Sequence, residues 1–224
     1  MSVSVEQLLQ QNAARLWRAR ETGRSAAAAV PAGLPTGYAA LDRCLPGAGW
    51  PRQGLIEILS DQRGIGELRL LLPALAVLCR DEGAADEVYP SPHDRDSAGW
   101  IAWVSPPYRP YAPSLAAWGI DVGRMLVVNG AGATEWVMDQ ALRSESCSAV
   151  LGWANPRDPH ALRRLQLAAE ASRSLAVLYR PLQAGLTPSP AVLRLALLGG
   201  GTEGLQVRIV KSRGGRPVTV SLGH

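Results

Sequence analysis

The 224-residue chain lacks phenylalanine entirely, and it contains one lysine and three cysteines. Cys44, Cys79 and Cys147 lie far apart, form no CxxC pair and have no metal-ligand spacing with the three histidines. We therefore expect no metal site. We also expect the three thiols to be buried or incidental, in a reducing cytosol.

Long apolar runs are missing too. The longest, from Leu70 to Cys79, is too short to span a bilayer, and residues 1–20 carry charge and glutamine throughout, unlike a signal peptide. These absences exclude a membrane-spanning class and predict a cytoplasmic protein.

Charge and hydrophobicity limit the class further. Hydrophobic residues make up 47% of the chain, enough for a real core, so the chain as a whole is not disordered. The net charge is +4, and Lys211 is the only lysine among 23 basic residues. This balance suits an acidic partner such as nucleic acid without requiring one, since codon bias also produces arginine-rich chains.

The first 34 residues differ from the rest. Apolar side chains recur at steps of three and four residues between 4 and 21, which predicts an amphipathic helix with Leu8, Leu9, Leu16 and Trp17 on one face. Residues 22–34 are rich in glycine, alanine and proline and read as a linker. The apolar face either folds back on its own domain or docks on a neighbouring subunit.

From residue 35 onward, short apolar runs alternate with helical patterns, as in an α/β domain with a mostly parallel sheet. Helices are expected at 67–80, kinked by Pro73, at 111–118, at 135–144 with Thr134 as N-cap, and from Asp158-Pro159. The expected strands are 55–59, 101–104, 125–128, 149–152 and 174–179, followed by three antiparallel strands at 191–198, 205–210 and 218–222.

The stretch LPTGYAALDRCLPGAGWPRQGLIEILSDQRGIGELRLLLPALA, residues 34–76, resembles the opening of the RecA recombinase core. Its GWPRQ and GIGELRLLLPALA segments are similar to the ImuA family of translesion-synthesis accessory proteins. The likeness continues through AAWGIDVGRMLVV to VRIVKSRGGRP, and so covers about residues 35–220. It implies a RecA-like core at 35–224, preceded by a helix and linker at 1–34.

The phosphate-binding loop expected at this place is altered. A working loop, GxxxxGK[ST], needs a lysine for the phosphate charge and a hydroxyl for magnesium. The matching residues run from Ser60 to Glu67, with Gly64 retained, Gly66 at the lysine and Glu67 at the hydroxyl. An acid at an anion-binding helix end repels a triphosphate, so we expect no nucleotide cofactor.

Two further catalytic positions are lost in the same comparison. Trp153 takes the place of the magnesium-binding aspartate, and Pro107 that of the activating glutamate. Metal-assisted hydrolysis needs both a metal ligand and an oriented water. The resemblance therefore implies a chain with no catalytic residues.

The loops that meet single-stranded DNA in RecA-like filaments are short here. Arg157, Arg163, Arg164 and Arg180 lie near them and are the candidate DNA contacts, with a solvated charged surface as the alternative. Of the seven tryptophans, five lie in or beside the expected core elements (Trp100, Trp103, Trp118, Trp136 and Trp153), so we expect most of them to fill a core without phenylalanine.

Interface residues remain. In RecA filaments a basic pair reaches into the neighbour's nucleotide site, and the resemblance puts Lys211 and Arg213 there; an ordinary surface pair is the alternative. With Arg216 and the apolar face of residues 4–21, they form the expected partner interface.

The family resemblance implies an accessory role in DNA-damage-induced translesion synthesis. Its implied partners are RecA, ImuB (a Y-family polymerase relative without catalysis) and, indirectly, an error-prone replicative-type polymerase, with weak single-stranded DNA binding and nucleoid association. Two alternatives stay open. One is a divergent ATPase that uses Arg63 for phosphate and Glu67 for metal, and the other is a SulA-type division inhibitor acting on FtsZ.

Overall fold

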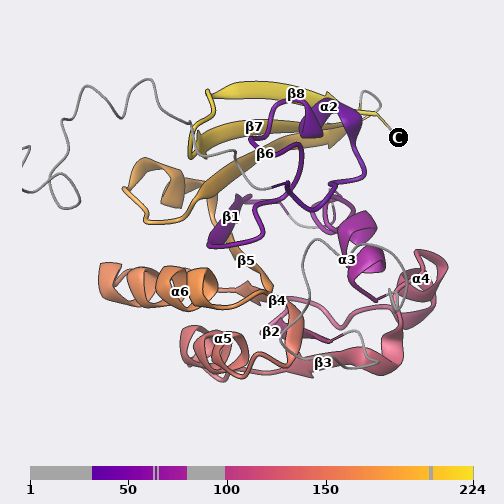
Figure 1. The fold of residues 1–224 in the computed structure, drawn as a ribbon, viewed down its shortest axis with the longest axis vertical. Coiled ribbons are helices and arrows are strands. Elements are labelled where there is room, and N and C mark those ends of the chain that lie inside the picture. Colours follow the sequence, from indigo (N-terminus) through magenta and orange to yellow (C-terminus); the bar gives the residue numbers. More distant parts are fainter. Residues whose placement is uncertain (1–31, 63, 65, 80–98, 202–203, 224) are drawn as a thin grey trace, which may run out of the picture. The chain divides into compact units, whose positions relative to one another are not determined.

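The computed structural model describes residues 32–62, 64, 66–79, 99–201 and 204–223. In these residues one eight-stranded sheet has the order β3-β2-β4-β5-β1-β6-β7-β8 (Figure 1). The strands are β1 (Leu55–Leu59), β2 (Trp100–Val104), β3 (Met125–Val128), β4 (Cys147–Trp153), β5 (Leu175–Arg180), β6 (Leu193–Gly201), β7 (Gly204–Ser212) and β8 (Val218–Leu222). The helices are α2 (Ala39–Asp42), α3 (Leu72–Cys79), α4 (Ala112–Ala117), α5 (Thr134–Arg143) and α6 (Pro159–Ala171), with 3-10 turns η1 (Val122–Arg124) and η2 (Leu182–Leu186).

The strands from β3 to β6 are parallel, and β7 and β8 are antiparallel to their neighbours. The expected mostly parallel α/β sheet with antiparallel C-terminal strands is therefore confirmed in outline. One feature was not expected: β6 is antiparallel to β7 as predicted, but it also pairs in parallel with β1, at Ile56↔Leu193 and Glu57↔Arg194. The long connection from β5 through η2 is what lets β6 return in the same direction.

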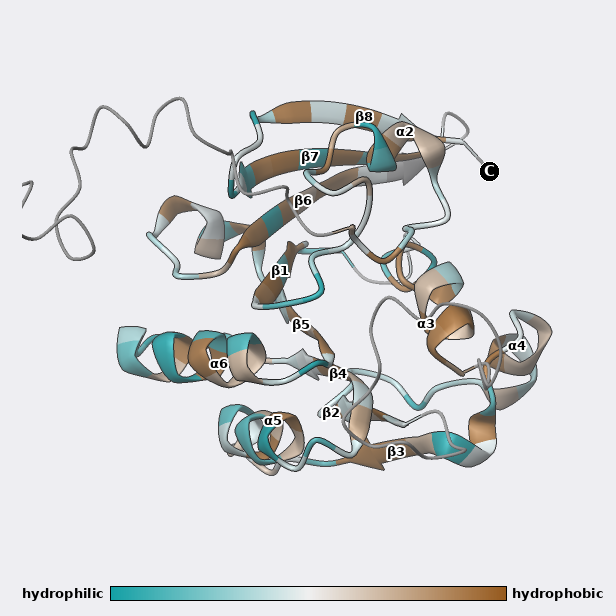
Figure 2. Cartoon of the chain, viewed as in Figure 1, coloured by the Kyte–Doolittle hydropathy of each residue, from teal (hydrophilic) through white to brown (hydrophobic). Residues whose placement is uncertain are grey.

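Alternate strand residues feed two separate cores, because successive side chains point to opposite sheet faces. Ile56, Ile58 and Val177 face α2, α3 and α4 in the larger core, while Leu55, Val150 and Leu178 face α5 and α6 in a second one. In Figure 2 the central strands are mostly hydrophobic, and the hydrophilic residues of α5 and α6 lie on their outer sides.

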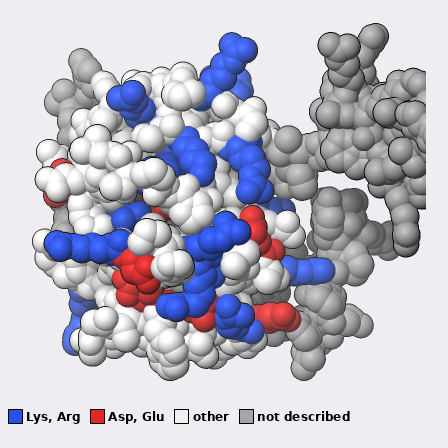
Figure 3. Space-filling model, turned by 90° about the vertical axis from the view of Figure 1, so that its left-hand side faces the viewer, with Lys and Arg blue, Asp and Glu red and all other residues white. Residues whose placement is uncertain are grey.

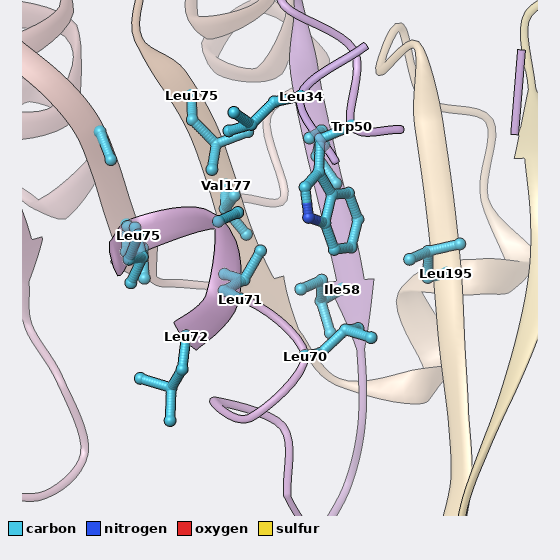
Figure 4. Packing of buried hydrophobic residues seen from close by; sticks show 14 of the residues in the cluster. Leu34, Trp50, Ile58, Leu70, Leu71, Leu72, Leu75, Leu175, Val177 and Leu195 are labelled. Atoms are coloured by element: carbon cyan, nitrogen blue, oxygen red, sulfur yellow. The ribbon is translucent and has the colours of Figure 1, made fainter. Parts of the chain in front are cut away.

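Trp50 anchors the entrance to the larger core. Its ring is fully buried near Ile58 and Leu195 (Figure 4), and its backbone pairs with Leu34 in an isolated bridge, with N···O distances of 2.9 and 2.7 Å. Gly49 and Leu34 approach so closely that a side chain at position 49 would collide with the Leu34 carbonyl. The segment before β1 is thereby fixed against the sheet.

Two helix starts differ from the sequence expectation. The helix expected at 67–80 begins at Leu72, so Pro73 lies in its first turn, where no backbone donor is lost, and does not kink an interior. Thr134 is the first residue of α5 and not its cap; Ala133 holds the cap position, and the Thr134 hydroxyl lies 2.7 Å from that of Ser105. The start of α6 is as expected, because the Asp158 carboxylate accepts from the His160 N–H at 2.9 Å.

The tryptophans divide into two groups. Trp50 and Trp103 are buried and Trp153 is partly buried, whereas Trp100, Trp118 and Trp136 are 42%, 38% and 59% exposed. The expectation that most of them fill the core is wrong for these last three. Leucine, which is also strongly hydrophobic but smaller, is the commonest residue of the core instead.

Candidate functional site

A cavity of about 390 Å³ opens where the parallel strands β1, β2, β4 and β5 end. This edge is where open α/β sheets usually bind ligands. Its lining comes from residues that follow three of these strands (Ser60, Asp61, Glu67, Ser105, Pro107 and Asn155) and from Trp153, Tyr179 and Arg180. The cavity thus collects several of the positions that the sequence singled out.

The loop after β1 folds around its own carboxylate. The Gly64 backbone N–H donates to Glu67 Oε1 at 2.9 Å, and Gly64 and Gly66 have φ values of 75° and 101°, which favour glycine. Backbone N–H groups in such a loop are the donors that cradle phosphate in active relatives of this motif. Here a side-chain anion of the same chain accepts one of them.

The helix end that would support phosphate binding is also displaced. The Leu71 and Leu72 amides donate to the Leu68 carbonyl in a turn, and regular helix begins only at Leu72. The attraction of a helix N-terminus for an anion fades within one turn. Gly66 and Glu67 therefore lie ahead of the helix end.

Trp153 ends β4 and forms an aromatic row with its neighbours on the sheet. Its ring stacks on Tyr179 with centroids 4.8 Å apart and an interplanar angle of 4°, and lies 5.5 Å from Trp103. The Tyr179 hydroxyl donates to the Glu67 carbonyl at 3.2 Å. Burial, assisted by the nearby Glu67 charge, raises the pKa of Tyr179 well above its usual value. At the position where the resemblance implies a magnesium-binding carboxylate, β4 therefore ends in a stacked indole.

The segment after β2 brings a hydroxyl and a proline to the cavity. Ser105, at φ 54°, accepts from the Gly130 N–H at 3.0 Å, while Pro107 lies on the cavity wall. The acids that line the cavity are Asp61 and Glu67, both from the loop after β1. Asp61 accepts from the Leu182 amide at 2.9 Å and so ties this loop to η2. Within the described ranges, no three His, Cys, Asp or Glu side chains lie together as metal ligands would.

A buried ion triad lies beside the cavity, on the second face of the sheet. Glu57 is fully buried in β1; its Oε1 is 3.1 Å from Arg180 Nη1, and its Oε2 is 2.7 Å from Arg194 Nε. Ser189 adds a third donor, its hydroxyl 2.6 Å from Oε1. The triad was not predicted from the sequence. A glutamate in LIEIL and an arginine in LRLAL, each within an apolar strand, could have indicated a buried ion pair.

Arg180, a candidate DNA contact, is not at the surface. Its side chain is 4% exposed, and besides Glu57 it donates to the Asn155 side chain at 3.2 Å and the Pro156 carbonyl at 3.1 Å. Its donors are directed inward because the Glu57 charge draws the guanidinium beneath the loop. Arg194 similarly donates to the Thr187 and Ala184 carbonyls. The two arginines therefore hold the loops after β4 and β5.

The other candidate DNA contacts are exposed. Arg157 precedes α6, and Arg163 and Arg164 lie on its outer side. Figure 3 shows one face of the molecule, on which Lys and Arg side chains outnumber Asp and Glu.

The C-terminal cations have neighbours within the chain. Lys211 donates to the Ser189 carbonyl at 2.8 Å, and Arg213 lies 3.7 Å from the Glu170 carboxylate in an exposed pair. Burial, then the nearby Arg194, lowers the pKa of Lys211. Arg216 is exposed in the turn before β8. The expected interface residues Leu8, Leu9, Leu16 and Trp17 lie outside the described residues.

The fold and the cavity define an α/β protein with a ligand-sized cavity at the carboxyl ends of its parallel strands, where the loop after β1, residues 60–67, contains two acids and no lysine. No protein-family model matches the chain. It is 27% identical over 210 residues to Protein ImuA of two Caulobacter vibrioides strains, covering 82% of this chain and 80% of the relative. The resemblance to the ImuA family is therefore confirmed over most of the chain.

A second similarity is shorter. The chain is 35% identical over 88 residues to the cell division inhibitor SulA of Edwardsiella piscicida, which covers 38% of this chain and about half, 52%, of that relative. The crystal structure of SulA from Pseudomonas aeruginosa matches with a TM-score of 0.40 and 23% identity, over 56% of this chain and 97% of that one. In the described part of the chain, no helix has the length and apolarity needed to cross a membrane.

Proposed function

We propose that this chain is a non-catalytic accessory protein of DNA-damage-induced translesion synthesis, with a RecA-like core at residues 35–224. It binds RecA and ImuB, acts through them on an error-prone replicative-type polymerase, and caps or remodels RecA filaments. The observation that carries the proposal is the hydrogen bond from the Gly64 N–H to the Glu67 carboxylate, because the phosphate cradle already holds an anion.

Electrostatics supports the absence of nucleotide chemistry. The cavity contains Asp61 and Glu67, and the guanidinium of Arg180 is paired with Glu57. A phosphate charge about 4 Å from one carboxylate is opposed by about 4 kcal/mol at an effective dielectric constant near 20. Because roughly 1.4 kcal/mol is a factor of ten, one such contact weakens binding by about three orders of magnitude.

Partner binding is assigned to the helix predicted from sequence at residues 4–21 and to the C-terminal cations Lys211, Arg213 and Arg216. An apolar stripe on a helix outside the main domain needs a surface to bury it. A protein that offers one filament interface but cannot cycle nucleotide would join a filament end and stop its growth. The similarity to ImuA over most of the chain supports this role.

The test is to mix the protein with RecA and single-stranded DNA and to measure RecA ATPase activity and filament length. We expect shorter filaments and less ATPase at excess protein. The double variant Leu8→Glu/Leu16→Glu should lose this effect, whereas Gln7→Glu/Gln11→Glu, on the opposite side of the predicted helix, should keep it. Unchanged filaments, with no RecA retained in a pull-down, would refute the capping role.

The divergent ATPase is the first competing function. It would need Arg63, which is outside the described residues, to bind phosphate, and Glu67 to bind metal. Calorimetric titration with ATP and magnesium separates the two functions. Micromolar binding would favour the enzyme, and no heat up to millimolar ATP would favour the accessory protein.

The SulA-type inhibitor is the second competing function, and the 35% identity over 88 residues favours it. It predicts that the protein lowers the amount of FtsZ that sediments with GTP. The accessory role predicts no change in that assay, with RecA binding intact.

A further inference from the structure

Among the described residues, β7 and β8 have one face that no α-helix covers, here called the β7–β8 outer face. Val207, Ile209, Val220 and Leu222 point into the larger core, so the alternate residues point the other way. These are Gln206, Arg208, Val210, Thr219 and Ser221, of which Arg208, Thr219 and Ser221 are exposed and the other two half-buried.

Within the described residues, no helix packs over this face. Leu41 of α2 belongs to the larger core, on the other side of β8, and α5 and α6 pack on a separate core built from β1, β2, β4 and β5. The cluster of Ala184 in η2 with Ala196 in β6 also contacts Val210, so this end of the face on β7 is partly covered. A sheet face without a helix is normally solvated or occupied by a partner.

The charge on this part of the chain has one sign. Residues 204–223 contain Arg208, Lys211, Arg213 and Arg216 and no Asp or Glu. Acids on packed elements are already engaged: Glu57 is paired with Arg180 and Arg194, and Glu170 lies 3.7 Å from Arg213. On α2, which packs on β8, the Asp42 carboxylate accepts from the Thr36 N–H at 3.0 Å. The cations crowd one another too, because Arg194 and Arg213 both contribute to lowering the pKa of Lys211.

We propose that the β7–β8 outer face, with Lys211, Arg213 and Arg216 at its end, binds the phosphate backbone of single-stranded DNA independently of sequence. Arginine and lysine in a row along one strand match a row of phosphates. From Arg208 to Arg213 the row is about 17 Å long at about 3.3 Å per residue. It follows one strand, so it fits a single backbone better than the two backbones that flank a groove about 12 Å wide.

The chemistry of the face disfavours other occupants. Membrane-surface binding needs a broad apolar side to insert, and this face offers only the half-buried Val210. A protein hot spot usually contains aromatic anchors, and the strand residues of this face include none, so the partner contact proposed for Lys211, Arg213 and Arg216 would be a polar one at the end of the face. The lack of aromatic residues also means that no base stacks here, so the contact is electrostatic, weak and sensitive to salt.

The test measures fluorescence anisotropy of a labelled oligo-dT with the full chain at 50–200 mM salt. The variant Arg208→Gln/Lys211→Gln/Arg216→Gln should weaken binding and flatten the log–log salt slope by about 2, at about 0.7 for each phosphate contact on a single strand. The matched control Arg157→Gln/Arg163→Gln/Arg164→Gln removes the same charge beside α6 and should change the slope by less than half as much.

Three results would overturn the assignment: no binding of oligo-dT by the unaltered chain, an equal or larger effect of the α6 control, or tighter binding to a duplex or to anionic phosphatidylserine vesicles. Circular dichroism of both variants checks that they are folded. The inference does not rest on RecA binding, so it can fail while the filament assay succeeds, and the reverse.

Discussion

Glu57 is a single carboxylate shared by two guanidinium groups inside a sheet. Arg180 reaches it from β5 and Arg194 from β6, and all three side chains are at most 5% exposed. Burying charges costs several kcal/mol per ion unless their partners are well placed. Each arginine also makes two hydrogen bonds to the loops, Arg180 to Asn155 and Pro156 and Arg194 to Thr187 and Ala184, so removing Glu57 would leave both guanidinium groups buried without their counter-charge.

We predict that Glu57→Gln destabilises the protein by about 3–5 kcal/mol, because it leaves two buried cations without a counter-charge. Urea unfolding measures this as a lower midpoint. The control Glu170→Gln alters an exposed pair with a 3.7 Å separation and should cost less than about 1 kcal/mol. A loss below 1 kcal/mol for Glu57→Gln would mean that the triad is not needed for the fold.

The sequence identified which residues are unusual at the site but not what they contact. Glu67 and Trp153 were recognised from the positions they occupy in the resemblance. That Glu67 accepts from Gly64 depends on local backbone dihedrals, and that Trp153 stacks on Tyr179 depends on the pairing of β4 with β5; no periodic pattern encodes either. Arg180 shows the opposite error, because an arginine beside a loop looks exposed until its buried partner is known.

At the scale of elements, hydrophobic pattern located the strands well and helix ends poorly. All eight strand regions were expected from apolar runs, since strands buried on both faces are nearly continuous in hydrophobic residues. The start of α3 was placed five residues early because Glu67 to Leu72 are good helix formers, while the glycines and the Glu67–Gly64 contact hold the first turn in another conformation. The parallel pairing of β6 with β1 depends on the course of the loop between β5 and β6, which hydrophobic periodicity does not indicate.

Close packing between α5 and β4 gives an element-scale prediction. A methyl group at Gly152 would collide with the Met138 side chain, which is fully buried on α5. Gly152→Ala should therefore destabilise the protein by about 1–3 kcal/mol in urea unfolding. Gly223→Ala, where nothing lies within 4 Å of the new methyl, is the control and should change stability by less than about 0.5 kcal/mol.

A double-mutant cycle sharpens the test. Met138→Ala alone should cost about 2–5 kcal/mol. Combined with Gly152→Ala the total should be smaller than the sum, because the new methyl enters the vacated space. Strict additivity would show that Gly152 and Met138 do not constrain each other.

For the molecule as a whole, buried ionisable groups set the response to alkaline pH. Burial raises the pKa of Tyr38, Cys79, Cys147 and Tyr179. The folded state therefore keeps protons that the unfolded state releases from about pH 9 upward. The lowered pKa of Lys211 acts in the opposite direction but is a single group. Stability is therefore complete below about pH 8 and falls above pH 9.

We predict that the free energy of unfolding declines between pH 9 and pH 11, by at most about 1.4 kcal/mol per pH unit for each group involved. Tyr179→Phe should make the decline shallower, since this tyrosine is buried, whereas Tyr108→Phe, at a residue 67% exposed, should not. Urea midpoints at four pH values measure both. A decline of equal steepness in the two variants would contradict the assignment.

The bond between Glu67 and Gly64 has a temporal consequence. In an ordinary phosphate loop, nucleotide hydrolysis and exchange switch the loop between two states at a defined rate. The Glu67 carboxylate is part of the chain, so it can be neither hydrolysed nor exchanged. Complexes of this protein would therefore last as long as mass action and competing partners allow, and ending them would fall to some other component of the cell.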